Sequence, residues 1–184
     1  MGETDEALML AYGSGDAGAF ERLYARHKGP LYRYVLRSVK ARGEAEELFQ
    51  DIWMKVIEAR ARYQPKAKFT TWLYTVAHNR MVDHWRSRGL AIVASTDDEE
   101  SAVPEPSAPP SAEPHRIGEA RETLERLAAA VAALPLAQRE AFLLHHEAEL
   151  SIAEIAAATG ANEEAAKSRL RYAMNKLREA IADD

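Results

Sequence analysis

The chain has 184 residues, 47% of them hydrophobic, which allows one or two small domains with ordinary cores and excludes a disordered protein. It contains no cysteine, so disulfides, cysteine-based zinc sites and thiol chemistry are excluded, and we expect a reducing compartment, the cytoplasm. The formal net charge is -5, no apolar run approaches the length of a membrane span and the start of the chain is acidic, so we expect neither export nor membrane insertion.

The first part of the chain has the apolar spacing of helices. Asp16 is a suitable cap for a helix that runs through Tyr24, and Pro30 predicts a break before a second apolar pattern that starts at Leu31. We therefore expect two short helices in this segment.

Residues 44–60 form an amphipathic pattern. Leu48, Ile52 and Val56 recur at helical spacing on one side. Four polar residues share the other side: Glu46, Glu47, Gln50 and Asp51. A helix of this kind buries one face and presents the other to solvent or to a partner.

A basic helical segment follows. Thr70 is a suitable cap for a helix that includes Trp72 and Trp85. Between residues 59 and 90 only Asp83 opposes seven basic residues: Arg60, Arg62, Lys66, Lys68, Arg80, Arg86 and Arg88. Such a concentration of positive charge favours a nucleic-acid partner in spite of the negative total. No segment of the chain predicts a strand.

Residues 91–115 divide the chain. This stretch is rich in Pro, Ser and Ala, carries six acidic and no basic residues, and has no periodic apolar face. It predicts a disordered acidic linker between residues 1–90 and 116–184. Two interpretations remain open: a solvated tether, or a polyanionic strand that occupies a positively charged channel meant for nucleic acid.

The pattern of residues 151–178 predicts a helix-turn-helix. Ser151 and Glu154 form a capping box, Gly160 can take the positive φ of a sharp turn, and Asn162 can cap the second helix. The apolar face of that helix, which we expect to pack inward, consists of Leu170, Met174, Leu177 and Ile181.

The second helix of this pair has the side chains of a DNA reader. Residues 165–178 contain no acid and carry five basic residues, with Ser168 and Asn175 among them: Lys167, Arg169, Arg171, Lys176 and Arg178. The alternative is that these charges only solubilise an amphipathic helix. The clean charge separation favours DNA binding.

Three motifs in this order resemble the sigma-70 family of bacterial transcription initiation factors, and most closely its extracytoplasmic-function (group 4) type. They are AEELFQDIWMKV, FTTWLYTVAHNRMVDHWRSR and LPLAQREAFLLHHEAELSIAEIAAATGANEEAAKSRLRYAMNKLRE. The resemblance implies an all-α protein of two small domains, with residues 1–90 similar to region 2 and residues 116–184 similar to the helix-turn-helix region 4. It leaves no room for region 3.

The resemblance also implies partners. Core RNA polymerase would be bound through the coiled coil of its largest subunit and through its flap, with Glu46, Glu47, Gln50 and Asp51 facing the coiled coil. Promoter DNA would be the second partner, and an inhibitory anti-sigma factor is a possible third.

For the promoter's -10 element, the resemblance implies single-strand capture by the segment from Tyr63 to His84. Asn79 and the loop from Tyr63 to Phe69 would form a pocket for one flipped base. The residues assigned to this element are Tyr63, Lys66, Lys68, Phe69, Asn79, Arg80, Asp83, His84, Arg86 and Arg88. For the -35 element they are Lys167, Ser168, Arg169, Arg171 and Asn175.

Distance constrains how the two domains act. Promoter elements two helical turns apart are separated by roughly 70 Å. A relaxed coil of 25 residues spans only about 25 to 30 Å, although full extension reaches about 80 to 90 Å. We therefore expect core polymerase to hold the domains apart, and the isolated protein to bind promoter DNA poorly.

Two other functions are compatible with parts of the chain. A stand-alone helix-turn-helix regulator explains residues 151–178 but not the basic segment before the linker. A metal-dependent hydrolase would need a site such as His145, His146 and Glu149, yet adjacent histidines on a helix point about 100° apart. We expect no catalytic residues, no metal and no cofactor.

Overall fold

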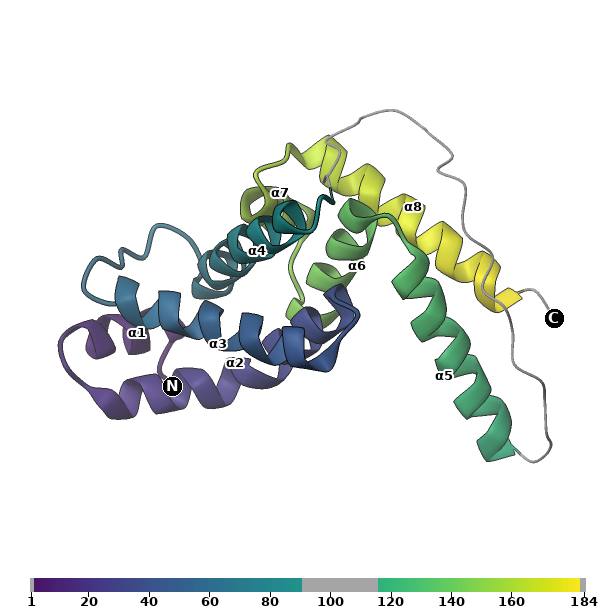
Figure 1. Ribbon diagram of the computed structural model, residues 1–184. Helices are drawn as coiled ribbons and strands as arrows, with labels where there is room; N and C mark the ends of the chain where they lie inside the picture. Colours follow the sequence, from purple (N-terminus) through teal and green to yellow (C-terminus); the bar gives the residue numbers. More distant parts are fainter. Residues whose placement is uncertain (1, 91–115, 183–184) are drawn as a thin grey trace.

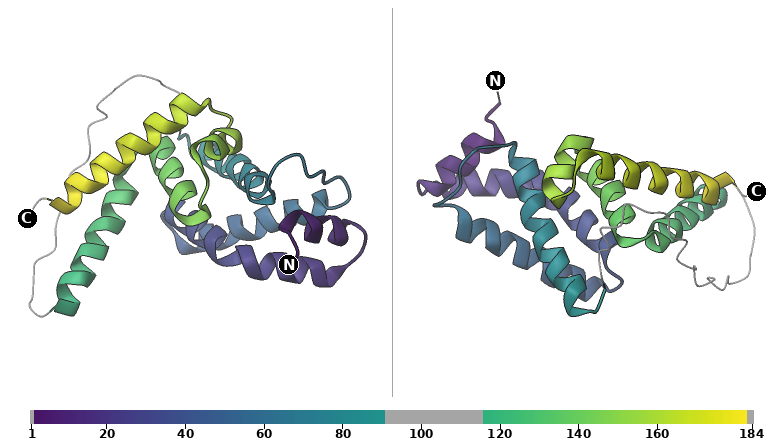
Figure 2. Two further views of the ribbon diagram at one scale, coloured as in Figure 1. Left: turned by 180° about the vertical axis from the view of Figure 1, so that it is seen from behind. Right: turned by 90° about the horizontal axis from the view of Figure 1, so that it is seen from above.

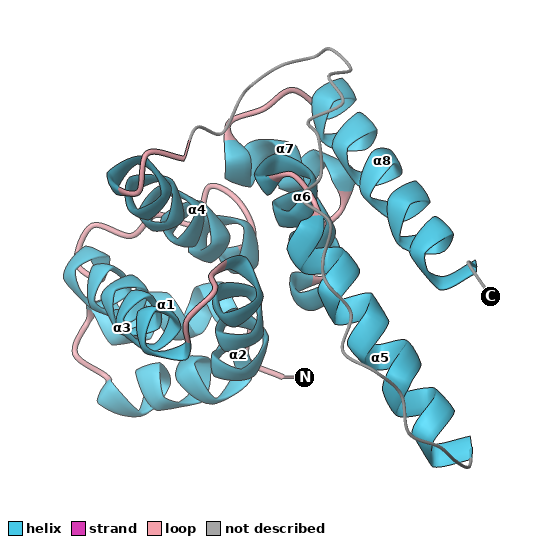
Figure 3. Ribbon diagram, turned by 45° about the vertical axis from the view of Figure 1, so that its right-hand side comes forward, coloured by secondary structure: helices cyan, strands magenta, loops and turns pink. Residues whose placement is uncertain are grey.

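The computed structural model describes residues 2–90 and 116–182, which hold eight helices. They are α1 (Asp5–Gly13), α2 (Ala17–Ser38), α3 (Arg42–Ala59), α4 (Phe69–Ser87), α5 (Arg116–Ala133), α6 (Leu136–Ala148), α7 (Ile152–Thr159) and α8 (Glu163–Ala182). Every regular element in these ranges is a helix, which confirms the predicted all-α fold (Figure 3). The predicted linker, residues 91–115, lies outside the described residues. No helix in the described ranges is long and apolar enough to cross a bilayer.

Helices α1 to α4 enclose an apolar core. Helices α1 and α3 both pack on α2, and α4 packs on α3 (Figure 1). Leu23, Leu31, Ile52 and Leu73 are fully buried. Because burying one such side chain contributes roughly 1.5 to 3 kcal/mol, the apolar stripes at helical spacing determine both the helices and their packing.

Helix α2 is continuous across Pro30, so the prediction of two short helices was wrong. Pro30 has no N–H to donate to the carbonyl four residues earlier. The buried stripe nevertheless continues past it, with Leu23, His27, Leu31 and Val35 at every fourth position. Packing along this stripe offsets the loss of one backbone hydrogen bond.

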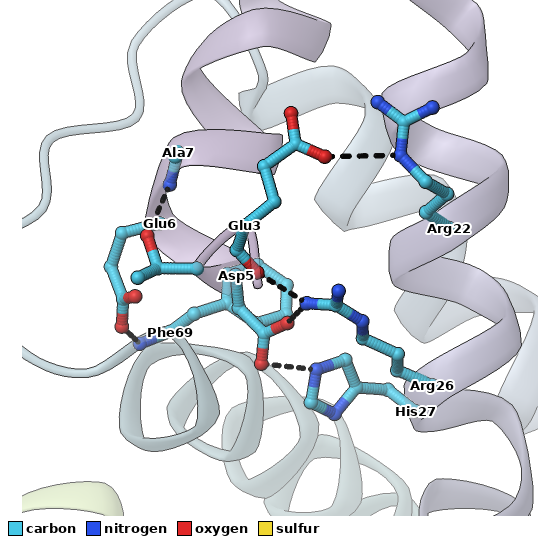
Figure 4. Close-up of polar contacts among 9 residues, drawn as sticks. Glu3, Asp5, Glu6, Ala7, Arg22, Arg26, His27 and Phe69 are labelled. Atoms are coloured by element: carbon cyan, nitrogen blue, oxygen red, sulfur yellow. Dashed lines mark hydrogen bonds and ion pairs between the residues drawn. The ribbon is translucent and has the colours of Figure 1, made fainter. Parts of the chain in front are cut away.

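Helix α1 is fixed to α2 by its acidic first turn (Figure 4). The Asp5 carboxylate accepts a hydrogen bond from Arg26 Nη1 at 2.8 Å and pairs with His27 Nε2 at 2.8 Å. Leu8 and Met9 of the same helix are fully buried. Polar and apolar contacts therefore act together to hold α1 in place.

Helix α4 is capped from α1 and not by Thr70, which corrects the sequence prediction. Its N-cap residue is Lys68, which makes no side-chain cap bond. Instead, Glu6 Oε1 accepts a hydrogen bond from the backbone N–H of Phe69 at 2.6 Å (Figure 4). A carboxylate at this position satisfies a free N–H and interacts favourably with the helix dipole.

The predicted helix-turn-helix is present as α7 and α8. Ser151 Oγ accepts a hydrogen bond from the Glu154 N–H at 3.2 Å, and Glu154 Oε2 accepts one from the Ser151 N–H at 2.8 Å, which completes the capping box. Gly160 ends α7 with φ 67°. Asn162 Oδ1 then accepts from the Ala165 N–H at 2.8 Å and caps α8.

The inward face of α8 differs from the predicted one at its end. Ala173 and Leu177 are buried and Leu170 is half-buried. Ile181, expected to pack inward, is 42% exposed. Ile181 belongs to the last turn of α8, and this end of the helix extends past α6 (Figure 1).

The halves before and after the linker pack against each other. Helix α6 lies on α2 and α7 lies on α4, as both views of Figure 2 show. Within the second half, helices α5 and α8 also pack on each other.

Replacing Pro30 with alanine should raise the stability of the protein. The alanine would supply the missing N–H donor within α2, while the loss of proline's constraint on the unfolded chain would offset part of the gain, leaving about 1 kcal/mol. Urea unfolding followed by circular dichroism measures this difference. Ala25→Gly at an exposed position of the same helix is the control and should lower stability. A Pro30→Ala protein less stable than wild type would contradict the account of α2.

Candidate functional site

The acidic side of α3 lies beside the basic side of α4. Asp51 Oδ2 accepts hydrogen bonds from Arg80 Nε at 3.0 Å and from Arg80 Nη2 at 2.8 Å. Glu44 forms an ion pair with Arg88. Residues that the sequence assigned to two different partners are thus in direct contact, because Asp51 belongs to the polymerase set and Arg80 to the DNA set.

The remaining polar residues of α3 are open to solvent. Glu46, Glu47 and Gln50 are exposed, and Glu46 accepts a hydrogen bond from Arg42 Nε at 3.2 Å. We call these three side chains together the α3 face. Its negative charge also acts on α4: burial and the nearby Arg80 lower the pKa of His84, and Glu47 offsets part of that shift.

A cleft of about 470 Å³ lies between the α3–α4 loop, the first turns of α4 and α7. Its lining includes the loop residues Arg62, Gln64, Lys66 and Ala67, the α4 residues Thr71, Trp72 and Thr75, and Ala157 of α7. Tyr63 also contributes to the lining. Basic and amide side chains at the rim and an aromatic wall are suited to a nucleotide base with its phosphate.

Two aromatic residues predicted to contact DNA belong to the core. Phe69 is fully buried and Tyr63 is 7% exposed. Their rings meet at 6.2 Å between centroids, and Tyr63 meets Trp72 at 5.0 Å. Burial, with the charges of Glu6 and Asp5, raises the pKa of Tyr63 to about 12. Trp72 is half-buried, so its ring is more accessible than those of Tyr63 and Phe69.

Asn79 lies outside the cleft lining. It is exposed on α4, one turn beyond Thr75, which does line the cleft. The structure therefore places Asn79 on the same side of α4 as the cleft. It does not bring Asn79 and the loop from Tyr63 to Phe69 together in one pocket. The other predicted DNA contacts of this half that are exposed are Lys66, Lys68, Asp83, Arg86 and Arg88.

The predicted DNA-reading face of α8 is accessible. Lys167, Arg171 and Asn175 are exposed, whereas Ser168 and Arg169 are half-buried. The guanidinium of Arg171 lies over the ring of Tyr172, 5.2 Å from its centroid. Basic side chains at this spacing, on a helix that follows a tight turn, can enter a DNA groove.

Two buried carboxylates of α6 were not anticipated from the sequence. Glu140, 3% exposed, accepts a hydrogen bond from Tyr34 Oη at 2.8 Å, and the same oxygen pairs with His78 Nδ1 at 2.7 Å. Glu147, 8% exposed, pairs with Arg33 Nε at 2.7 Å and with Arg37. Burial and the neighbouring Glu140 raise the pKa of Tyr34 well above its ordinary value. The sequence offered one sign of this burial: Glu140 stands directly before the apolar residues of α6 that form its buried face.

Helix α7 adds a charged contact with the edge of the cleft. Lys68 Nζ lies 3.1 Å from Glu154 Oε1. Hydrogen bonding to Ser151, with the charge of Lys68, lowers the pKa of Glu154. One of the lysines assigned to single-stranded DNA is therefore neutralised by α7 in this arrangement.

The residues of the candidate metal site have other contacts. His145 Nδ1 lies 3.0 Å from the carbonyl of Leu150, and His146 stacks on Phe142. Within residues 2–90 and 118–182, no three His, Asp or Glu side chains are arranged to hold a metal ion.

Family comparison places most of the chain in two known regions. The Sigma-70 region 2 model matches residues 23–90, and the Sigma-70, region 4 model matches residues 124–177. The chain is 32% identical over 176 residues to the RNA polymerase sigma factor CarQ of Myxococcus xanthus, which covers 95% of this chain and 96% of CarQ. It is 30% identical over 168 residues to the ECF RNA polymerase sigma factor RpoE of Cereibacter sphaeroides, with coverage of 91% and 88%.

Two solved structures share the fold. CnrH, in complex with the cytosolic domain of CnrY, has a TM-score of 0.71 at 23% identity, over 99% of this chain and 100% of CnrH. The sigma factor RpoE of Bartonella quintana, in complex with the anti-sigma factor NepR, has a TM-score of 0.66 at 24% identity, over 90% and 98%.

The Asp51–Arg80 pair should show measurable energetic coupling. A double-mutant cycle with Asp51→Asn and Arg80→Gln, read by urea unfolding, should give about 0.5 to 1 kcal/mol that falls as salt is added. The control is the more exposed pair of Arg42 and Glu46 on α3 alone, which should couple less strongly. Equal coupling in the two pairs would show that the α3–α4 contact has no special role.

Proposed function

This chain belongs to the sigma-70 family, in its extracytoplasmic-function group, and from this premise we propose which of its residues meet polymerase and promoter. It is a transcription initiation factor that binds core RNA polymerase. The observation that carries the proposal is the pairing of a basic, aromatic-walled cleft, lined mainly by the first half, with an accessible helix-turn-helix in the second half. We place it in the cytoplasm and assign it no catalytic step of its own.

We propose that the two halves recognise different promoter elements. Residues 1–90 form the region 2-like domain, which binds polymerase and melts the -10 element. Residues 116–184 form the region 4-like domain, which binds the -35 element and the polymerase flap. Residues 91–115, outside the described residues, connect them.

Polymerase is proposed to bind the α3 face. Glu46, Glu47 and Gln50 are exposed and can face basic side chains of the largest subunit's coiled coil. Asp51 is half-exposed and already bonded to Arg80, so it has a double role. It adds negative charge to the surface of this chain that binds polymerase, and it orients Arg80 towards DNA.

Melting is proposed to use the cleft and the basic side chains around it. Opening a duplex costs stacking and pairing energy, which stacking of a splayed base offsets by about 1 to 3 kcal/mol. Trp72 is the aromatic side chain of the cleft best placed to touch such a base, because Tyr63 and Phe69 are buried. Lys66, Arg86 and further basic residues would neutralise the phosphates of the displaced strand. Asn79 would hydrogen-bond to the edge of a base that lies beside the cleft.

The -35 element is proposed to be read by α8. Lys167, Arg171 and Asn175 present charged and amide groups to solvent along one side of the helix. Arg and Lys suit phosphates and guanine edges, whereas Asn suits adenine. Ser168 and Arg169 are half-buried and would make their contacts at the border of this surface.

Promoter binding is proposed to require separation of the two halves. Elements roughly 70 Å apart cannot both be reached while α6 lies on α2 and α7 on α4. Glu154 of α7 also neutralises Lys68, and Ala157 forms part of the cleft wall. The isolated protein should therefore bind promoter DNA poorly until polymerase draws the halves apart.

An inhibitory partner is also proposed. The structurally similar CnrH and Bartonella quintana RpoE were each solved with a bound protein, in the second case an anti-sigma factor. A partner of that class would act on this chain before it meets polymerase.

Run-off transcription tests the proposed function. Core polymerase with this protein should start synthesis at a cognate promoter, found by mapping where the two together occupy the genome. Core polymerase alone, or with a protein carrying Glu46→Lys, Glu47→Lys and Gln50→Lys, should not. A stand-alone regulator is the alternative: it would bind duplex DNA without polymerase and fail to confer initiation, and that result would refute the proposal.

Substitutions in α8 should separate phosphate contacts from base contacts. If Lys167 meets only phosphate, Lys167→Ala should weaken all promoters alike and reduce the salt slope of binding by about one. If Asn175 reads a base, Asn175→Ala should change sequence preference and leave the salt slope unchanged. Holoenzyme binding to a promoter library at several salt concentrations gives both quantities. Exposed Glu179→Gln is the control. The assignment fails if both variants match this control.

A further inference from the structure

Helix α1 touches both ends of the loop that lines the cleft. The loop covers residues 60–68, between the last residue of α3 and the first of α4. It contributes five of the residues that line the cleft: Arg62, Tyr63, Gln64, Lys66 and Ala67. The shape of the cleft therefore depends on how this loop is held.

The carboxy-terminal end of the loop is held by Glu6. Its Oε1 accepts the hydrogen bond from the Phe69 N–H at 2.6 Å, at the residue where the loop becomes helix (Figure 4). A hydrogen bond to an ionised group is roughly twice as strong as a neutral one. It also determines where α4 begins, and with that the position of Trp72 in the first turn.

The amino-terminal end of the loop is held by the last turn of α1. A Cβ atom added to Gly13 would lie 2.5 Å from the carbonyl oxygen of Arg60, so only glycine allows this close backbone approach. The guanidinium of Arg60 lies over the ring of Tyr12, 5.7 Å from its centroid. The start of the loop thus rests against α1.

Helix α1 and the residue Glu3 before it make ion pairs with α2. Asp5 pairs with Arg26 and His27 of α2, and Glu3 pairs with Arg22 at 3.3 Å (Figure 4). The ring of His27 also lies 5.2 Å from that of Phe69. Contacts therefore run from α2 through α1 to both ends of the loop.

We propose that α1, which lies outside the residues matched by the family model, positions the loop for base capture, and that Glu6 and Gly13 are positioning residues of promoter melting. This inference rests on the proposed function, because it assigns the cleft to a base of the melted strand. Neither residue touches DNA. Both act by keeping the cleft in the form that a flipped base fits.

The test compares Glu6→Ala, Glu6→Gln and Glu21→Ala in holoenzyme. Glu21 is an exposed carboxylate of α2 and serves as the control. The opening rate is followed with a fluorescent base analogue in the melted element, on a duplex promoter and on the same promoter with a premelted bubble. Affinity for core polymerase is measured in parallel.

Glu6→Ala should slow opening of the duplex about fivefold to tenfold, as expected for one lost charge-assisted hydrogen bond. Polymerase affinity and initiation from the premelted bubble should stay at the wild-type level. Glu6→Gln keeps an acceptor oxygen and should recover most of the rate. Should Glu6→Ala fail to fold, Glu6→Asp takes its place, because its shorter side chain weakens the same bond. It should likewise slow duplex opening and leave polymerase affinity and bubble initiation unchanged.

Normal opening by Glu6→Ala would overturn the proposal. Equal losses in polymerase affinity, duplex opening and bubble initiation would overturn it as well, since they indicate general destabilisation. Failure of the proposed function is a distinct result: wild-type holoenzyme itself would then open no promoter.

Discussion

Two buried carboxylates of α6 hold the halves of this protein together. Glu140 is bonded to Tyr34 and His78, and Glu147 to Arg33 and Arg37. An unpaired charge at such a position costs several kcal/mol, so each carboxylate requires its partners while it is buried. Helix α7 follows α6 after a short turn, and this packing therefore also brings α7 onto α4 and the cleft.

The same chemistry limits how strongly the ion pairs hold the contact. Desolvation opposes the attraction within a buried ion pair, and its net contribution is small compared with that of apolar packing. In the proposed separation of the halves, water and polymerase subunits can solvate the released charges. A polar interface of this kind fits the proposal that the two halves part to reach promoter elements roughly 70 Å from each other.

Local features were predictable and distant pairings were not. The capping box of Ser151 and Glu154 and the turn at Gly160 lie within a few residues, so the helix-turn-helix was confirmed. Pro30 was misinterpreted because burial along α2 outweighs one lost hydrogen bond. Glu140 and Glu147 pair with residues 62 to 114 positions away. Tyr63 and Phe69 illustrate the limit at the site, since an aromatic loop residue has the same sequence pattern whether it packs in the core or stacks on a base.

The distance between the halves tests this account most directly. The chain has no cysteine, so Ala25→Cys on α2 and Ala129→Cys on α5, both exposed, can carry spin labels without interference. The labelled protein alone should give one short, narrow distance. Binding to core polymerase should lengthen it, and Glu140→Gln with Glu147→Gln should produce a long-distance population in the isolated protein, whereas Glu179→Gln should not. An unchanged short distance in holoenzyme would contradict the account.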